Sequence, residues 1–168
     1  PWYGQRLDIV QKLFPKSKYL HMIRDGRGVA LSFKRSPWWH DDVYENLERW
    51  NSEVLKIQDD AQRYLDKDQL LNIRYEDIVF DPELYLKKIC DFLGVEFEKQ
   101  MLDSKSWFDY RSYVKADKKS DASAHYVKWS EENKNPVFDG SINSWKEHDF
   151  SSIPDHIKQT LDMFGYEC

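Results

Sequence analysis

The sequence predicts an α/β fold with parallel strands, because short apolar runs alternate with amphipathic helical segments. Residues 18–23 and 69–78 are apolar runs with the length of buried strands, and helical patterns separate them. A strand, helix, strand order indicates a parallel pair joined by a right-handed crossover. The chain has 168 residues, 40% of them hydrophobic and 15% aromatic, which favours a sizeable core over disorder. We therefore expect a single domain across residues 1–168.

The N-terminal part of the chain alternates helix and strand. Residues 5–14 form an amphipathic helical pattern that Pro15 ends, and the strand 18–23 follows directly. Residues 24–28 (RDGRG) are predicted as a loop and residues 29–35 as a helix. Strand, glycine-containing loop and helix is the order in which α/β folds present anion-binding sites.

The middle of the chain contains a long helix and the second strand. Apolar residues at helical spacing predict a helix from residue 43 to about residue 65. The strand 69–78 is expected to run into a loop. Asp81-Pro82 then opens a helix, with the aspartate as its cap, and Gly94 closes it.

Three remaining segments have distinct patterns. Residues 37–42 (PWWHDD) are predicted as an aromatic and polar turn, with contact to a substrate as the alternative. Residues 104–140 are polar and irregular, a pattern that fits either a ligand lid or a surface loop. Residues 153–164 predict a last amphipathic helix.

Composition argues against several classes of function. The formal net charge of −5 argues against a protein that coats nucleic acid, but it permits binding of a small anionic nucleotide. Two cysteines, Cys90 and Cys168, are too few for a disulfide scaffold, and Cys90 fits a reduced core position. The five histidines lack metal-ligand spacing, and no stretch reaches transmembrane length.

Arg24 and Ser32 are the first candidates for ligand binding. Arg24 leaves the carboxyl end of the first strand, where ligands of open α/β sheets bind, and a guanidinium grips phosphate bidentately. Ser32 follows eight positions later, and its hydroxyl is a second donor. Gly26 and Gly28 are expected to let backbone amides approach the anion. The alternative is an ion pair between Arg24 and Asp25 beside a surface serine.

Three segments together resemble one known family. Residues 14–35, FPKSKYLHMIRDGRGVALSFKR, resemble the 3'-phosphate-binding segment of sulfotransferases that use 3'-phosphoadenosine 5'-phosphosulfate (PAPS). Their RDGR form is similar to that of tyrosylprotein sulfotransferases and related bacterial enzymes. Residues 73–97 resemble the family's Y-E-D strand end and following helix, and residues 140–150 with 153–168 resemble its C-terminal end. The resemblance covers nearly all of the chain.

The resemblance implies a three-layer α/β fold with a parallel sheet and flanking helices, related to P-loop nucleotide kinases. It also implies transfer of a sulfuryl group from PAPS, as co-substrate and without a metal ion, to a hydroxyl acceptor on carbohydrate, protein tyrosine or a small molecule. Residues 1–168 are then expected to be the C-terminal portion of a sulfotransferase domain. No nucleic-acid partner or membrane segment is expected, and the compartment stays open between cytoplasm and Golgi lumen.

The resemblance also assigns the first nucleotide-binding candidates. It implies that Arg24 and Ser32 hold the 3'-phosphate of PAPS and that Tyr75 lies near the nucleotide. Packing at the edge of the core is the alternative for Tyr75. Glu76 and Asp77 are expected to cap a helix or pair with neighbouring groups, and not to act in catalysis.

Two further candidates come from the C-terminal part of the chain. Ser130 lies near the place where a loop serine contacts the nucleotide in the tyrosylprotein branch, and Lys146 is expected either to reach a phosphate or to be an ordinary surface lysine. The family commonly has a basic residue directly before its loop tryptophan, whereas this chain has Ser144 before Trp145. For Trp145 we expect packing in preference to adenine stacking.

The catalytic base remains unassigned, because the family places it upstream together with the loop that cradles the 5'-phosphosulfate. Neither the strand before that loop nor the loop itself has a counterpart in the chain, so the chain alone is expected to have little or no turnover. Two alternatives stay open: a catalytically inactive nucleotide-binding or interaction domain of the same fold, and a kinase that uses ATP and magnesium.

Overall fold

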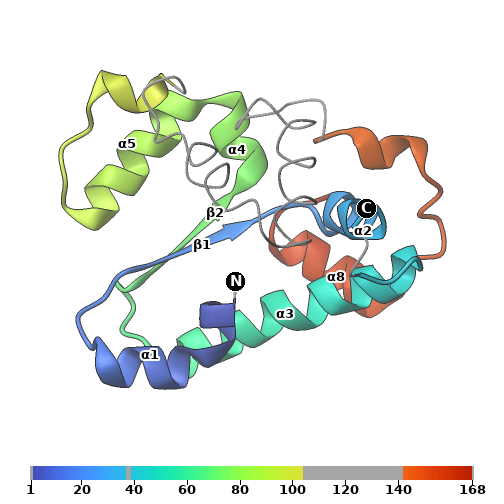
Figure 1. The fold of residues 1–168 in the computed structure, drawn as a ribbon, viewed down its shortest axis with the longest axis horizontal. Helices are drawn as coiled ribbons and strands as arrows, with labels where there is room; N and C mark the ends of the chain where they lie inside the picture. The colour runs from blue at the N-terminus through green and yellow to red at the C-terminus, as the bar shows by residue number, and fades with distance from the viewer. Residues whose placement is uncertain (1, 37–38, 104–141, 168) are drawn as a thin grey trace, which may run out of the picture.

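A computed structural model describes residues 2–36, 39–103 and 142–167, and Figure 1 shows their arrangement. The 3-10 helices (η), α-helices and strands in chain order are η1 (Trp2–Arg6), α1 (Leu7–Leu13), β1 (Tyr19–Ile23), α2 (Gly26–Lys34), α3 (Val43–Tyr64), β2 (Leu70–Arg74), α4 (Tyr75–Phe80), α5 (Pro82–Leu93), η2 (Lys99–Leu102), η4 (Ser144–Glu147) and α8 (Asp155–Met163).

The two strands form a parallel pair, as the sequence predicts. Tyr19 lies opposite Leu70 and Ile23 opposite Arg74, and α2 and α3 make the connection between the strands. Within the described residues the sheet consists of β1 and β2. In Figure 1 the strands pass between α4 and α5 on one side and α1, α3 and α8 on the other.

The hydrophobic core lies around α3, between β1 and α8. Leu47 is 0% and Trp50 4% exposed on α3, and they belong to one cluster with Ile23 of β1. Ile157 and Leu161 of α8 join the same cluster and are both 0% exposed. Because a fully buried aliphatic side chain contributes about 1.5–3 kcal/mol, this cluster fixes the C-terminal helix beneath the strands.

The two faces of β1 have different environments. Ile23 is 2% exposed, and His21 contacts Gln58 of α3 at 3.1 Å, so this face packs on the helix. Burial lowers the pKa of His21, which favours a neutral ring. Leu20 and Met22 alternate with these residues and are 45% and 57% exposed. The sequence predicts a buried strand, whereas in the described residues one face of β1 packs on helices and the other is exposed.

The helix after β1 begins earlier than the sequence predicts. The residues GRG of the expected loop 24–28 are the first turn of α2, which starts at Gly26. Asp25 caps this helix, because its carboxylate accepts a hydrogen bond from the Arg27 backbone N–H at 2.9 Å. The connection between β1 and α2 is thereby reduced to Arg24 and Asp25.

The second strand is shorter than predicted. β2 ends at Arg74, and residues 75–80 form the helix α4 instead of a continued strand and loop. Glu76 and Asp77 lie in the first turn of α4, where negative charge stabilises a helix. Arg74 also donates to the Asp77 carboxylate at 2.6 Å, and this contact favours the turn.

The predicted caps of the later helices are confirmed. Asp81 accepts a hydrogen bond from the backbone N–H of Leu84 at 3.1 Å, with Pro82 as the first residue of α5. Gly94 ends that helix with φ +76°, a conformation that favours glycine. Asp42 caps α3, and its carboxylate accepts from two backbone N–H groups. These caps fix the ends of α3 and α5 around the strand pair.

Candidate anion-binding site

Arg24 lies at the carboxyl end of β1, directly before the cap of α2. Its guanidinium packs against the first turn of α2, because a Cβ added to Gly28 would lie 3.3 Å from Nη2 and 3.4 Å from Nε. Its Cζ is also 5.6 Å from the centroid of the Tyr75 ring at the start of α4. The structure therefore brings Arg24 and Tyr75 together at the ends of neighbouring parallel strands.

Ser32 lies on the same face of α2 as the Arg24 guanidinium. Residues four positions apart are neighbours on a helix surface, so Ser32 follows Gly28 along one face. Since the guanidinium of Arg24 lies against Gly28, Ser32 is the residue one helical turn further along that face. Both side chains are half-buried. A guanidinium and a hydroxyl on one helix face form a donor set suited to a phosphate group.

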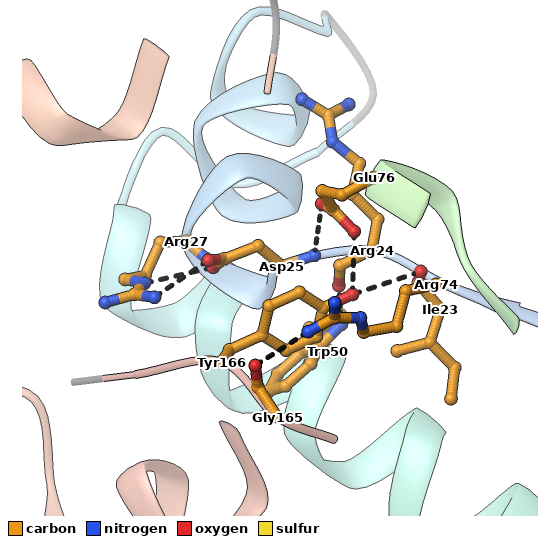
Figure 2. Close-up of polar contacts among 9 residues, drawn as sticks. All are labelled: Ile23, Arg24, Asp25, Arg27, Trp50, Arg74, Glu76, Gly165 and Tyr166. Carbon is orange, nitrogen blue, oxygen red and sulfur yellow. Dashed lines mark hydrogen bonds and ion pairs between the residues drawn. The ribbon is translucent and has the colours of Figure 1, made fainter. Parts of the chain in front are cut away.

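The neighbouring arginine has a different environment. Arg27 is 5% exposed, and its Nε and Nη2 donate to the two carboxylate oxygens of Asp25 at 3.0 and 2.8 Å. Its guanidinium also stacks on the ring of Trp145, with 3.6 Å between Cζ and the ring centroid. Figure 2 draws Arg24 and Arg27 on different sides of α2. The partner of Asp25 is thus Arg27, and the alternative pairing of Asp25 with Arg24 is wrong.

The peptide unit between Arg24 and Asp25 is held by side chains from two helices. The Asp25 N–H donates to Glu76 Oε1 at 3.0 Å, and Trp50 Nε1–H donates to the Arg24 carbonyl at 3.1 Å. Glu76 is 7% exposed on α4, and Trp50 lies in the core on α3. Figure 2 shows these contacts converging on the junction of β1 and α2. Glu76 pairs with neighbouring groups, as the sequence analysis expects, although its partner is 51 positions away along the chain.

Tyr166 joins the C-terminus to the same junction. Its hydroxyl lies 2.8 Å from Glu76 Oε2 and 3.2 Å from the Ile23 carbonyl oxygen, so both acceptors face one proton. Burial and the nearby Glu76 carboxylate raise the pKa of Tyr166, and the phenol keeps its proton as a donor. Arg74 Nη1 donates to the Gly165 carbonyl at 2.8 Å and holds the adjacent backbone.

Gly26 and Gly28 of the RDGRG segment make room for neighbouring side chains, and the approach of their backbone amides to an anion stays a prediction. A Cβ on Gly26 would lie 2.4–2.8 Å from atoms of the Trp50 ring, and a Cβ on Gly28 would press on the Arg24 guanidinium. Gly26 therefore admits the core tryptophan that binds the Arg24 carbonyl. Gly28 admits the side chain of Arg24 itself.

The C-terminal candidates are described in part. Lys146 is exposed in η4, with its Nζ 5.9 Å from the Trp145 ring centroid. Trp145 packs on Arg27, which agrees with the packing interpretation of this tryptophan. Ser130 lies outside the described residues. The donors brought together around the β1–α2 junction are therefore Arg24 and Ser32, with Tyr75 beside them.

The described residues directly before α3 pack against α2 and α3. The ring of Trp39 stacks on Phe33 at 4.7 Å between centroids, and the Arg49 guanidinium lies 4.1 Å from its centroid. His40 pairs with Glu45 at 3.0 Å. These contacts confirm the predicted aromatic and polar turn for the described part of this segment.

A cavity of about 350 Å³ lies beside the C-terminal end of β2. Its lining includes Arg74 and Asp77, which already pair with each other, together with Tyr85 and Lys88. Of the described nucleotide-binding candidates, none of Arg24, Ser32, Tyr75 and Lys146 lines it. Among the described residues, no cluster of histidine, cysteine or carboxylate side chains could hold a metal ion. No described helix combines the length and apolar character needed to cross a bilayer.

The chain belongs to the sulfotransferase family, whose sequence profile matches residues 1–99. It is 31% identical over 98 residues to protein-tyrosine sulfotransferase A of Caenorhabditis elegans, which covers 55% of this chain and 26% of that protein. It is 27% identical over 110 residues to the omega-hydroxy-beta-dihydromenaquinone-9 sulfotransferase of Mycobacterium tuberculosis, covering 58% of this chain and 28% of that protein. The chain thus spans less than a third of either relative.

The fold is that of solved sulfotransferase domains. The sulfotransferase domain of the Synechococcus PCC 7002 olefin synthase superposes on 100% of this chain with a TM-score of 0.75 and 24% sequence identity. The chain covers 57% of that domain. The α/β, P-loop-like fold that the resemblance implies is confirmed.

Proposed function

We propose that the protein transfers a sulfuryl group from PAPS to a hydroxyl acceptor, and that this chain supplies the part that binds the 3'-phosphate. The arrangement of Arg24 and Ser32 is the observation that carries the proposal. The guanidinium lies against Gly28 at the carboxyl end of β1, and Ser32 follows on the same face of α2. Ligands of open α/β sheets bind at this end of the strands.

The phosphate is expected to bind along the side of α2 and not at its N-terminus. The Asp25 carboxylate already accepts the Arg27 N–H there and places a negative charge at the helix start. Arg24 supplies a charge-assisted bidentate contact, and the Ser32 hydroxyl donates beside it. Tyr75 lies next to the guanidinium, where its ring would border the nucleotide. Sulfuryl transfer itself depends on positioning and on charge stabilisation at the oxygen that bridges the sulfuryl group and the leaving nucleotide.

The other two predicted contacts remain proposals with less support. Lys146 presents an exposed ammonium group on η4, and Trp145 ties that segment to α2 through Arg27. Ser130 is proposed on its resemblance to the tyrosylprotein branch alone. The acceptor is proposed at the level of a hydroxyl group on carbohydrate, protein tyrosine or a small molecule. No described residue is proposed as the catalytic base.

We also propose that residues 1–168 are the C-terminal portion of a larger sulfotransferase domain, with little or no turnover by themselves. The exposed apolar side chains of Leu20 and Met22 on the strand support this, since a sheet face of this kind is normally covered. The solved Synechococcus domain, of which the chain covers 57%, contains enough further polypeptide to provide such a cover.

Isothermal titration calorimetry with adenosine 3',5'-bisphosphate tests the proposal. Arg24→Ala removes a charge-assisted contact and is expected to reduce the binding free energy by about 1.5–3 kcal/mol, and Ser32→Ala by about 0.5–1.5 kcal/mol. Arg63→Ala is the matched control, because Arg63 pairs with Asp59 on the exposed side of α3. Unchanged affinity in Arg24→Ala would contradict the proposal. Nucleotide binding without PAPS-dependent sulfation by the protein would favour the inactive-domain alternative.

A further inference from the structure

The Arg24–Asp25 peptide is the short link between β1 and α2. It lies after the last residue of β1 and before the first residue of α2, so neither element supplies its hydrogen bonds. Its N–H donates to Glu76 Oε1 at 3.0 Å, and its carbonyl accepts from Trp50 Nε1–H at 3.1 Å. Because both polar groups are held, the plane of this peptide is fixed.

Glu76 is itself held in one orientation. Its second carboxylate oxygen accepts from the Tyr166 hydroxyl at 2.8 Å, and that hydroxyl also faces the Ile23 carbonyl at 3.2 Å. Tyr166 is 6% and Glu76 7% exposed, so water competes little for these contacts. A buried carboxylate with both oxygens occupied holds its partners more tightly than an exposed one.

The held peptide fixes where the Arg24 side chain starts relative to α2. The Cα of Arg24 belongs to this peptide unit, and the side chain runs from it toward Gly28 on α2. Figure 2 shows Glu76 bound to the Asp25 N–H, directly after Arg24 in the chain. Loss of the contact to Glu76 would let the junction of β1 and α2 shift, and with it the position of the Arg24 Cα relative to the helix face that carries Ser32.

We propose that Glu76 is a positioning residue for the nucleotide's 3'-phosphate: it orients Arg24 through the Asp25 N–H, with Tyr166 fixing its carboxylate. The inference rests on the proposed function and adds two residues to it, and one of them, Tyr166, directly precedes the last described residue. Glu76 does not touch the phosphate. It acts through Arg24, so its contribution to binding is expected to vanish when Arg24 is absent.

A double-mutant cycle on binding of adenosine 3',5'-bisphosphate tests this inference. Glu76→Gln keeps the side-chain volume but replaces the charged acceptor with a neutral amide, which weakens its hold on the Asp25 N–H, and it is expected to weaken binding about fivefold. In the Arg24→Ala background the same substitution is expected to leave the affinity unchanged. A general effect on folding would weaken binding equally in both backgrounds, which would overturn the inference.

Tyr166→Phe provides the second variant, because it removes one hydroxyl and leaves the ring in the core. We expect it to weaken binding in the Arg24 background by a factor of about three and not in the Arg24→Ala background. Tyr44→Phe is its matched control, since the Tyr44 hydroxyl donates to the Asp149 carbonyl, away from Arg24. If the unsubstituted protein fails to bind, the proposed function is wrong and the inference falls with it. If it binds and Glu76→Gln and Tyr166→Phe bind equally well, only the inference is wrong.

Discussion

At the level of single residues, neighbouring positions of the RDGRG segment have different contacts. Arg24 belongs to the proposed phosphate site, whereas Arg27 donates to the Asp25 carboxylate and stacks on the ring of Trp145. Gly26 lies under the Trp50 ring, and a Cβ there would approach that ring to 2.4 Å. Substitutions at neighbouring positions of one short motif are therefore expected to have different effects.

Gly26→Ala is expected to lower the free energy of unfolding by about 1–3 kcal/mol, because the added methyl group overlaps the rigid Trp50 ring. Gly28→Ala is the control on the same helix. Its methyl group meets the far end of the flexible Arg24 side chain at 3.3 Å, and alanine favours a helix, so we expect a change below about 1 kcal/mol. Urea denaturation followed by circular dichroism measures both, and equal effects would contradict this account of the two glycines.

The sequence points to Arg24 and Ser32 as candidates because strand, RDGR and helix are local signals, and their role in binding stays a prediction. It does not identify the partnership of Glu76 with Tyr166, because their contact joins residues 90 positions apart. The only signal for Tyr166 is its place in the C-terminal G-Y pair, which resembles the end of the family. The burial of Tyr166 follows from the packing of α8. The spacing of apolar residues in the sequence does not show which carboxylate the Tyr166 hydroxyl contacts.

At the level of elements, the N-terminus of α2 contains a buried ion pair, and the Trp145 ring of η4 stacks on the arginine of that pair. Arg27 and Asp25 side chains are each 6% exposed, and Trp145 covers the guanidinium. Propensity and apolar period place the start of α2 at residue 29, because two glycines disfavour a helix interior. The cap formed by Asp25 and the close approach of Trp50 overcome that preference. Likewise, α4 forms where a strand is predicted, because Arg74 binds Asp77 across its first turn.

Arg27→Ala is expected to destabilise the protein by about 3–5 kcal/mol, because it leaves the Asp25 carboxylate buried without its partner. The exposed pair of Arg63 and Asp59 offers the comparison within α3. Arg63→Ala is expected to change stability little, since water screens that pair. The free energy of unfolding from urea denaturation decides the matter, and a small effect of Arg27→Ala would show that the buried pair does not stabilise the helix start.

For the whole molecule, the proposed site depends on helices from distant parts of the chain meeting at the end of β1. α3 contributes Trp50, α4 contributes Glu76, and the residues after α8 contribute Tyr166. The parallel pair and most helices are predictable from apolar period and caps. The uncovered face at Leu20 and Met22 is not, because a period of two within one strand does not say which polypeptide covers each face.

The most direct test of the central claim is a crystal structure of the protein with adenosine 3',5'-bisphosphate. The account predicts the 3'-phosphate within hydrogen-bond distance of both the Arg24 guanidinium and the Ser32 hydroxyl, with the Tyr75 ring beside the nucleotide. A nucleotide bound elsewhere, for example in the cavity beside Arg74 and Asp77, with Arg24 and Ser32 out of reach of any phosphate, would contradict it.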